Sequence, residues 1–321
     1  MSNVLYSDHK RENSISSNIS QTRPLEELDM IDSFLFEGTT ESIEDAKLIA
    51  GVIIRRATGH TVENLIVETE KQLKGISLNK RGIRMDVLAA EKNGEKTLRI
   101  YDIEPNKYGE KDIPRRSRFY QSLIDSKLLP TDTKFKELPD SMSIWILPYD
   151  PFGDNRMLYT VKNMVVENNH LLYNDGVTKI FLYTKGTKGG SKELKELLTF
   201  MENTISDNAV DEELASIQQI VDKVKTRPDV KERYMTLQEV IDYEKRDSYE
   251  EGVEIGRAEG IELGRSEGIE LGRSEGIKLG IQSIISACRS LKQSQLETRD
   301  LLSKQFNCSK EKADEYINLY W

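Results

Sequence analysis

Apolar and polar positions alternate most clearly between residues 81 and 106. Two runs rich in branched and aromatic residues, MDVLAA and LRIYDI, flank an Asn-Gly pair at positions 93–94. Such a pair between two apolar runs is a strong β-hairpin signal. The pattern therefore predicts two neighbouring strands. Because side chains alternate along a strand, Asp102, Glu104 and Asn106 are expected to share one face of the second strand.

Helix-like and strand-like segments surround this predicted hairpin. The run SIEDAKLIAGVIIRRATG predicts a helix that begins after the capping residue Ser42 and ends at Gly59, and NLIVETEKQL predicts an edge strand. Further on, IPRRSRFYQSLIDSKLLP predicts a helix, SMSIWILP a buried strand and VTKIFLYTKG another strand. Two amphipathic helices follow, in SKELKELLTFMENT and DEELASIQQIVDKVKT. We expect an α/β sheet covered by helices, with Trp145 and Phe152 in its core.

A second pattern lies near the C-terminal end, where an octapeptide repeats over residues 251–280 with a glycine at every fourth position. Each glycine disfavours a helix by about 1 kcal/mol relative to alanine, so a helix here needs a partner. Glycines spaced by four leave a flat strip that another backbone can approach closely. We therefore expect a homo-oligomer formed through residues 251–280. The alternative is a poorly ordered, low-complexity spacer.

These patterns divide the chain into four parts. Residues 1–24 are polar and rich in Ser and Asn, which predicts a flexible N-terminal arm. Residues 25–228 contain the alternating strand and helix patterns of a folded domain. Residues 229–282 are expected to form a long helix that carries the repeats, and residues 283–321 a small helical module.

Charge and cysteine content narrow the possible functions. The net charge of −9 argues against a protein that coats nucleic acid nonspecifically. Residues 80–118, however, hold eleven Lys or Arg against seven Asp or Glu, the basic excess that a phosphate-binding surface requires.

Cys288 and Cys308 are the only cysteines, too few for a disulfide framework or a four-cysteine zinc site. No signal peptide and no apolar run of about 18 residues is evident, so we expect a cytoplasmic protein without a membrane span.

Each strand of the predicted hairpin carries an acid near its end, Asp86 in the first and Glu104 in the second. In neighbouring strands these two carboxylates can converge and bind a hard divalent cation such as Mg²⁺ through oxygen ligands. A metal in this position could activate a water and neutralise charge on a phosphodiester. Arg84 shares the face of Asp86. The alternative reading is an ordinary pair of solvated acids at strand ends.

An ordered series of motifs between about Ile31 and Tyr249 resembles the recombination-promoting nuclease (Rpn) family, also described as transposases of the PD-(D/E)XK nuclease superfamily. After Asp86 the series reads DIEPN, DIPRRSRFYQSLIDSKLL, ELPDSMSIWILPYDPFG, DGVTKIFLYTKGT and ERYMTLQEV. The resemblance implies a restriction-endonuclease-like mixed sheet flanked by helices. It also implies a metal-dependent DNA endonuclease that acts in recombination or on mobile elements.

The resemblance assigns roles to the acids and to the residues beside them. Asp86 and Glu104 would bind the metal together with the main-chain carbonyl of Pro105. Asn106 stands where the superfamily has a lysine and Rpn-like proteins usually have glutamine. An amide can orient a water by hydrogen bonds but brings no positive charge. An acid of the first helix, Glu41 or Glu44, could complete the shell.

The helix after the hairpin carries Arg116 and Arg118, which the resemblance places beside the active site. Together with Arg84 they are expected to hold a substrate phosphate. The alternative is a row of exposed arginines on an ordinary surface helix.

The leading hypothesis is thus a Mg²⁺-dependent DNA endonuclease. The second is a nuclease-fold protein without competent chemistry, acting as a DNA-binding or assembly protein, which the neutral Asn106 favours. A toxin or defence nuclease regulated by its tail is a third possibility.

Overall fold

The computed structural model describes residues 23–69, 72–73, 83–107, 112–128, 132 and 134–321. The chain divides into two compact units, residues 1–238 and 239–321. Most of the expected N-terminal arm, residues 1–24, lies outside the described residues. Of that segment, Arg23 forms an ion pair with Asp29 at 2.9 Å.

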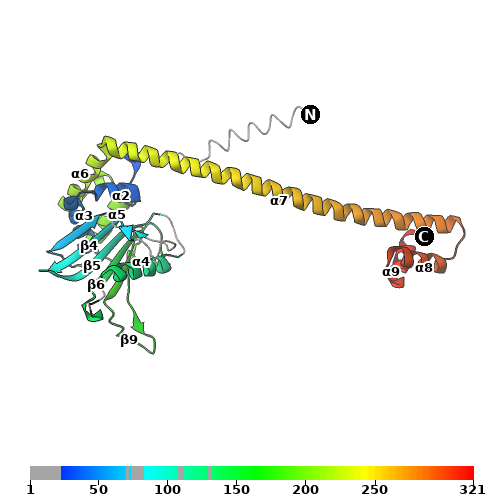
Figure 1. Cartoon of the computed structure of the whole chain (residues 1–321), viewed down its shortest axis with the longest axis horizontal. Helices are drawn as coiled ribbons and strands as arrows, with labels where there is room; N and C mark the ends of the chain where they lie inside the picture. The colour runs from blue at the N-terminus through cyan, green and yellow to red at the C-terminus, as the bar shows by residue number, and fades with distance from the viewer. Residues whose placement is uncertain (1–22, 70–71, 74–82, 108–111, 129–131, 133) are drawn as a thin grey trace. The chain divides into compact units, whose positions relative to one another are not determined.

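A six-stranded mixed sheet forms the centre of the first unit (Figure 1). Its order is β1 (Leu65–Thr69), β4 (Val87–Asn93), β5 (Lys96–Pro105), β6 (Asp140–Leu147), β10 (Val177–Tyr183) and β7 (Leu158–Val161). The strands β5, β6 and β10 are parallel to one another, and β4 and β7 are antiparallel to their neighbours. The predicted hairpin is therefore β4 and β5, and Gly94 supplies the positive φ of 60° that its turn requires.

Two small ladders stand apart from this sheet. In one, β2 (Gln72–Leu73) pairs with β3 (Ile83–Arg84), and in the other, β8 (Met164–Val165) pairs with β9 (Asn168–Leu172).

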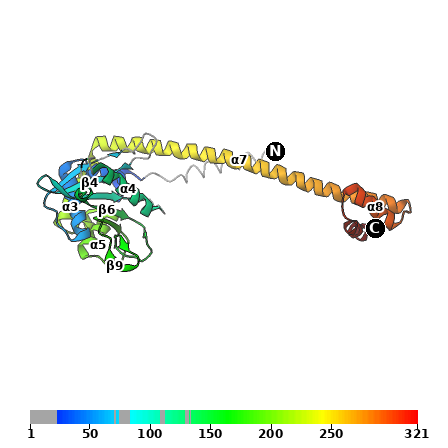
Figure 2. The same ribbon diagram turned by 60° about the horizontal axis from the view of Figure 1, so that its bottom comes forward.

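Helices cover both faces of the sheet, and Figures 1 and 2 show α4 on the other side from α3 and α5. On the first face pack α2 (Ser33–Thr39), α3 (Ile43–Thr58), α5 (Lys192–Glu202) and α6 (Glu212–Thr226). On the second face packs α4 (Ile113–Leu128). Three short 3-10 turns, Leu25–Glu27, Phe135–Glu137 and Ser206–Asn208, connect these elements. The expectation of an α/β sheet flanked by helices is confirmed.

Side-chain alternation along β5 separates the two cores. Tyr101 and Ile103 belong to the larger core, beneath α3 and α5, whereas Ile100 belongs to the smaller one, beneath α4. Asp102 and Glu104, which share the parity of Ile100, therefore face α4.

The two aromatic residues expected in the core behave differently. Trp145 is fully buried under α4, as predicted. The prediction for Phe152 was wrong, because its side chain is 46% exposed. Phe152 lies in the loop after β6 rather than in a strand, and it contacts the sheet only through the edges of neighbouring rings.

The second unit is helical. Helix α7 (Pro228–Ser290) begins in the first unit and continues past Gln238 into the second, where α8 (Gln295–Phe306) and α9 (Lys310–Tyr320) follow. It runs beyond the expected boundary at residue 282 because Ile281 and Ile285 are buried against Leu302 and its neighbours. None of the described helices carries an apolar stretch capable of crossing a membrane.

The glycine repeats are helical and exposed in the single chain. The eight apolar side chains within residues 251–280 are between 41% and 65% exposed. A Cβ added to any glycine from Gly252 to Gly276 in this repeat would meet nothing within 4 Å. This face of α7 is therefore open.

Candidate active site

The pairing of β4 with β5 brings Asp86 and Glu104 together at one end of the sheet. Val87 pairs with Ile103, so the next position along each strand sets Asp86 opposite Glu104. The backbone N–H of Asp86 donates a hydrogen bond of 3.1 Å to Glu104 Oε1. The two acids, 18 positions apart in sequence, are thus direct neighbours.

Asp102 is a third acid at the same place. It lies two residues before Glu104 on the face toward α4, is 1% exposed, and pairs across the sheet with Ser143 of β6. The sequence placed Asp102 on this face but gave it no role. The alternation along β5 was the sequence pattern that could have pointed to Asp102. Its burial, however, results from the packing of α4, which the pattern does not show.

The two acids considered as a third ligand, Glu41 and Glu44, have partners of their own in the structure. Glu41 forms ion pairs with Arg227, at 2.7 Å, and with Arg233. Glu44 is exposed and accepts a hydrogen bond from Ser42.

Burial and mutual repulsion make it unfavourable for these acids to ionise together. Burial raises the pKa of Asp102 to about 7, and the charge of Asp86 adds to the rise, whereas a hydrogen bond with Glu104 and the charge of Arg116 oppose it. Burial raises the pKa of Glu104 well above its usual range, and Asp102 and Asp86 act in the same direction. A cation bound among the three carboxyls would relieve this repulsion.

Polar atoms without hydrogen-bond partners gather here. Of the eight buried side-chain polar atoms that have no partner among the described residues, five belong to this group. They are both carboxyl oxygens of Asp102, Asn106 Nδ2, Ser143 Oγ and Trp145 Nε1. When Asp102 and Glu104 are both ionised, the oxygens of Asp102 have no hydrogen-bond donor. When Glu104 is protonated, its O–H can donate to Asp102. Each unmet buried group costs about 1–3 kcal/mol, which is typical of a site built for a ligand.

Arg116 brings a positive charge close to the acids. It lies in the first turns of α4, with its guanidinium 5.3 Å from the ring centres of both Tyr120 and Trp145. It donates a hydrogen bond of 3.1 Å to the Tyr120 hydroxyl. Its charge acts on Asp102 and Glu104, lowering the pKa of each. A planar, stacked guanidinium is well suited to hold a phosphate beside these acids.

The other candidate residues lie at different distances from the acids. Pro105 and Asn106 follow Glu104 directly, and the Asn106 N–H donates to Ile146 O at 2.9 Å. Arg118 is exposed on α4, and its charge acts on Lys179 of β10. Arg84 belongs to β3, and its side chain lies outside the described part of the chain.

The oxygen atoms of Asp86, Glu104 and Pro105 suit Mg²⁺ better than a cation that takes all of its ligands from protein side chains. In the described part of the chain, no three His, Cys, Asp or Glu side chains form such a cage. Mg²⁺ keeps several waters and commonly takes only one or two carboxylates from the protein. Asp86 and Glu104, with the main-chain carbonyl of Pro105 next in sequence, can provide such an open set.

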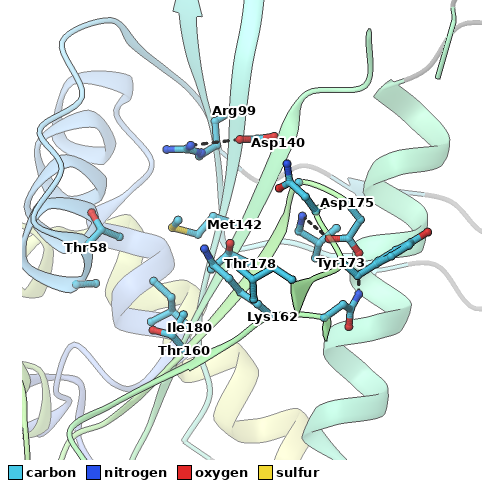
Figure 3. Close-up of a pocket in the computed structure, with 16 residues that line it drawn as sticks. Thr58, Arg99, Asp140, Met142, Thr160, Lys162, Tyr173, Asp175, Thr178 and Ile180 are labelled. Carbon is cyan, nitrogen blue, oxygen red and sulfur yellow. Dashed lines mark hydrogen bonds and ion pairs between the residues drawn. The ribbon is translucent and has the colours of Figure 1, made fainter. Parts of the chain in front are cut away.

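A cavity of about 330 Å³ lies elsewhere on the first unit. It is formed where β5, β6 and β10 begin, and Figure 3 shows Thr58, Met142 and Thr178 around it, with the Arg99–Asp140 ion pair on its wall. Glu104 stands near the other end of β5, so the cavity and the acids occupy opposite ends of the sheet. The cavity takes no part in the chemistry considered below.

Comparison with known proteins gives no match, whether to family models, to curated proteins or to solved structures.

Proposed function

We propose that this protein is a Mg²⁺-dependent DNA endonuclease whose first unit has a restriction-endonuclease-like fold. The observation that carries the proposal is the meeting of Asp86 and Glu104 beside the buried carboxyl of Asp102. The order of elements agrees with it, since an acid starts one strand of a hairpin and a second acid ends the other. The motif resemblance supplies DNA as the substrate and recombination or mobile-element activity as the process.

The residues divide the work of phosphodiester hydrolysis. Bound Mg²⁺ would supply a Lewis acid and a water of lowered pKa. Asp86, Glu104 and the Pro105 carbonyl would hold the cation, and the negative charge of Asp102 would favour its binding. The Asn106 amide donates a hydrogen bond that orients the attacking water. Arg116 binds the non-bridging oxygens of the phosphate and stabilises the charge that develops on them.

Nicking of supercoiled plasmid DNA by the full chain tests this proposal. We expect nicking with Mg²⁺ and none with EDTA. Asp86→Asn and Glu104→Gln should each slow nicking by more than about 100-fold, because they remove metal ligands. Glu212→Gln is the matched control, since Glu212 is exposed on α6, and it should leave the rate unchanged. Nicking that survives both ligand substitutions would refute the site.

The second candidate function is a binding or assembly protein on the same fold. It is favoured by the neutral amide of Asn106, which brings no charge to the water. A folded wild-type chain that binds DNA but nicks nothing with Mg²⁺ or Mn²⁺ would establish this alternative.

We also propose that the chain is a homo-oligomer through residues 251–280. The support is the exposure of the eight large apolar side chains of the repeats and the open space around the glycines from Gly252 to Gly276. Apolar surface of this extent is uncommon on a monomer.

We place the protein in the cytoplasm, where the free thiols of Cys288 and Cys308 stay reduced.

A further inference from the structure

The α4 side of the sheet carries two cations and an exposed aromatic ring that the proposed chemistry does not use. Arg118 projects from α4, Lys179 from β10, and Phe152 from the loop after β6. We call Arg118, Lys179 and Phe152 the α4–β10 strip.

The two cations of the strip lie near one another without a close acid. Lys179 shares the strand face of Phe181, which packs in the core beneath α4. Neither Lys179 nor Arg118 has a carboxylate within 4 Å among the described side chains, and Asp175 is the acid whose charge acts on Lys179 from farther away. Partial burial lowers the pKa of Lys179, and repulsion from Arg118 lowers it further. Two like charges held in this way favour an anion between them.

Phe152 is exposed but rigidly held. Its ring meets Tyr159 and Phe181 edge to face, with ring centres 5.0 Å and 5.4 Å apart. Asp150 fixes the loop by accepting hydrogen bonds from the Tyr159 hydroxyl at 2.7 Å and from the N–H of Phe152 at 3.1 Å. The N–H groups of Gly153 and Asn155 also donate to Asp150. These four donors fix the loop and hold the Phe152 ring in place.

The strip continues from the acids along one row of the sheet. Glu104 pairs with Trp145 on β6, and Trp145 pairs with Phe181 on β10. Neighbouring strands are about 4.8 Å apart, so Phe181 stands roughly 10 Å from Glu104. Phe152 packs on Phe181. A nucleic acid strand held at the acids can thus reach the strip within a few nucleotides.

We propose that the α4–β10 strip binds a single-stranded DNA segment next to the bond that is cut, with phosphates at Arg118 and Lys179 and a base stacked on Phe152. The inference rests on the proposed nuclease function. A cationic track beside an exposed ring is the usual means of binding single strands without sequence preference, because each base offers a face for stacking. In a duplex the bases are already stacked, so Phe152 has nothing to bind. The preferred substrate is therefore DNA with a frayed, flapped or single-stranded region.

Fluorescence anisotropy tests this with the full chain in EDTA, so that binding is measured without cleavage. The probe is a labelled oligothymidylate of about 12 nucleotides, and a duplex of equal length is the competitor. Phe152→Ala should weaken binding of the single strand about 10-fold. Phe152→Tyr keeps an aromatic ring and should bind as the wild type does. Lys179→Gln and Arg118→Gln should each lower the slope of log affinity against log salt by about 0.7. Duplex affinity should respond to the two cation variants but not to Phe152→Ala.

Matched controls are Phe135→Ala and Lys195→Ala, whose side chains are exposed outside the strip; both should bind as the wild type does. Melting curves establish that every variant is folded. Equal affinity of wild type and Phe152→Ala for the single strand would overturn the proposal, and so would equal salt slopes for wild type and the cation variants. If the wild type nicks DNA but the strip variants bind single strands as tightly as the wild type does, the strip proposal is refuted and the nuclease proposal stands. If the strip variants weaken binding but the wild type does not nick DNA, the nuclease proposal is refuted and the strip proposal stands.

Discussion

At the scale of single residues, the decisive feature is that Asp102 and Glu104 are both buried on one strand face. An acid whose pKa rises on folding holds a proton that the unfolded chain has lost at the same pH. Asp102 titrates near 4 when unfolded and at about 7 in the folded protein. Between these values the folded state binds more protons at Asp102, so the contribution of Asp102 to the free energy of unfolding falls as the pH rises and levels off above about 7.

Asp102→Asn should therefore stabilise the metal-free protein at pH 8, because it removes a buried charge and keeps the shape of the side chain. We expect a gain in unfolding free energy of about 1 kcal/mol or more at pH 8 and a clearly smaller gain at pH 5. Thermal melting in EDTA across this pH range measures both. The exposed Asp207→Asn is the control and should leave the pH dependence as it is. An equal effect of Asp102→Asn at both pH values would contradict the assignment.

At the scale of elements, short local signals fix where helices begin and end. Ser42, Ser191 and Asp211 each accept a backbone hydrogen bond at the start of a helix, from the residue three positions later. Gly59 ends α3 in the left-handed conformation, with φ of 75°. The sequence revealed Ser42 and Gly59 as the ends of α3 because a cap involves only neighbouring residues.

Gly186 differs from these positions because a segment distant in sequence leaves no room for a side chain there. A Cβ on Gly186 would lie 2.6 Å from the backbone of Arg156 and Met157. Gly186→Ala should therefore displace the turn after β10 and destabilise the protein by roughly 2 kcal/mol or more. Gly51→Ala, inside α3 with nothing within 4 Å, should instead stabilise it by about 0.5–1 kcal/mol. Urea unfolding compares the two variants, and a similar effect of both would contradict the close approach.

At the scale of the whole molecule, the two units carry different properties. The described acids, Arg116 and the α4–β10 strip belong to the first unit, and the glycine repeats belong to the second. Assembly can therefore be altered without touching the candidate site.

Deleting residues 251–280 should reduce the mass measured by light scattering to that of one chain and leave the fold of the first unit intact. A finer variant replaces Gly252, Gly260, Gly268 and Gly276 by alanine. Each replacement favours the helix by up to about 1 kcal/mol and fills the strip between packed backbones. Helix content by circular dichroism should rise while the mass falls. An unchanged mass in both variants would exclude assembly through the repeats.

The sequence by itself determined the elements and the face on which the acids stand. The Asn-Gly turn, the alternation along β5 and the caps of α3 are local, so a pattern of neighbouring residues encodes them. That was enough to set Asp86 and Glu104 at the ends of paired strands.

Only the tertiary structure decided which other residues join them. It placed Asp102 beside Glu104, Arg116 near these acids and Arg118 near Lys179, and it left Phe152 exposed. These outcomes depend on the parallel pairing of β5, β6 and β10 and on the way α4 lies across them. Such contacts join residues tens of positions apart, and the free energy that selects them comes from burying both faces of one sheet, which no local pattern encodes.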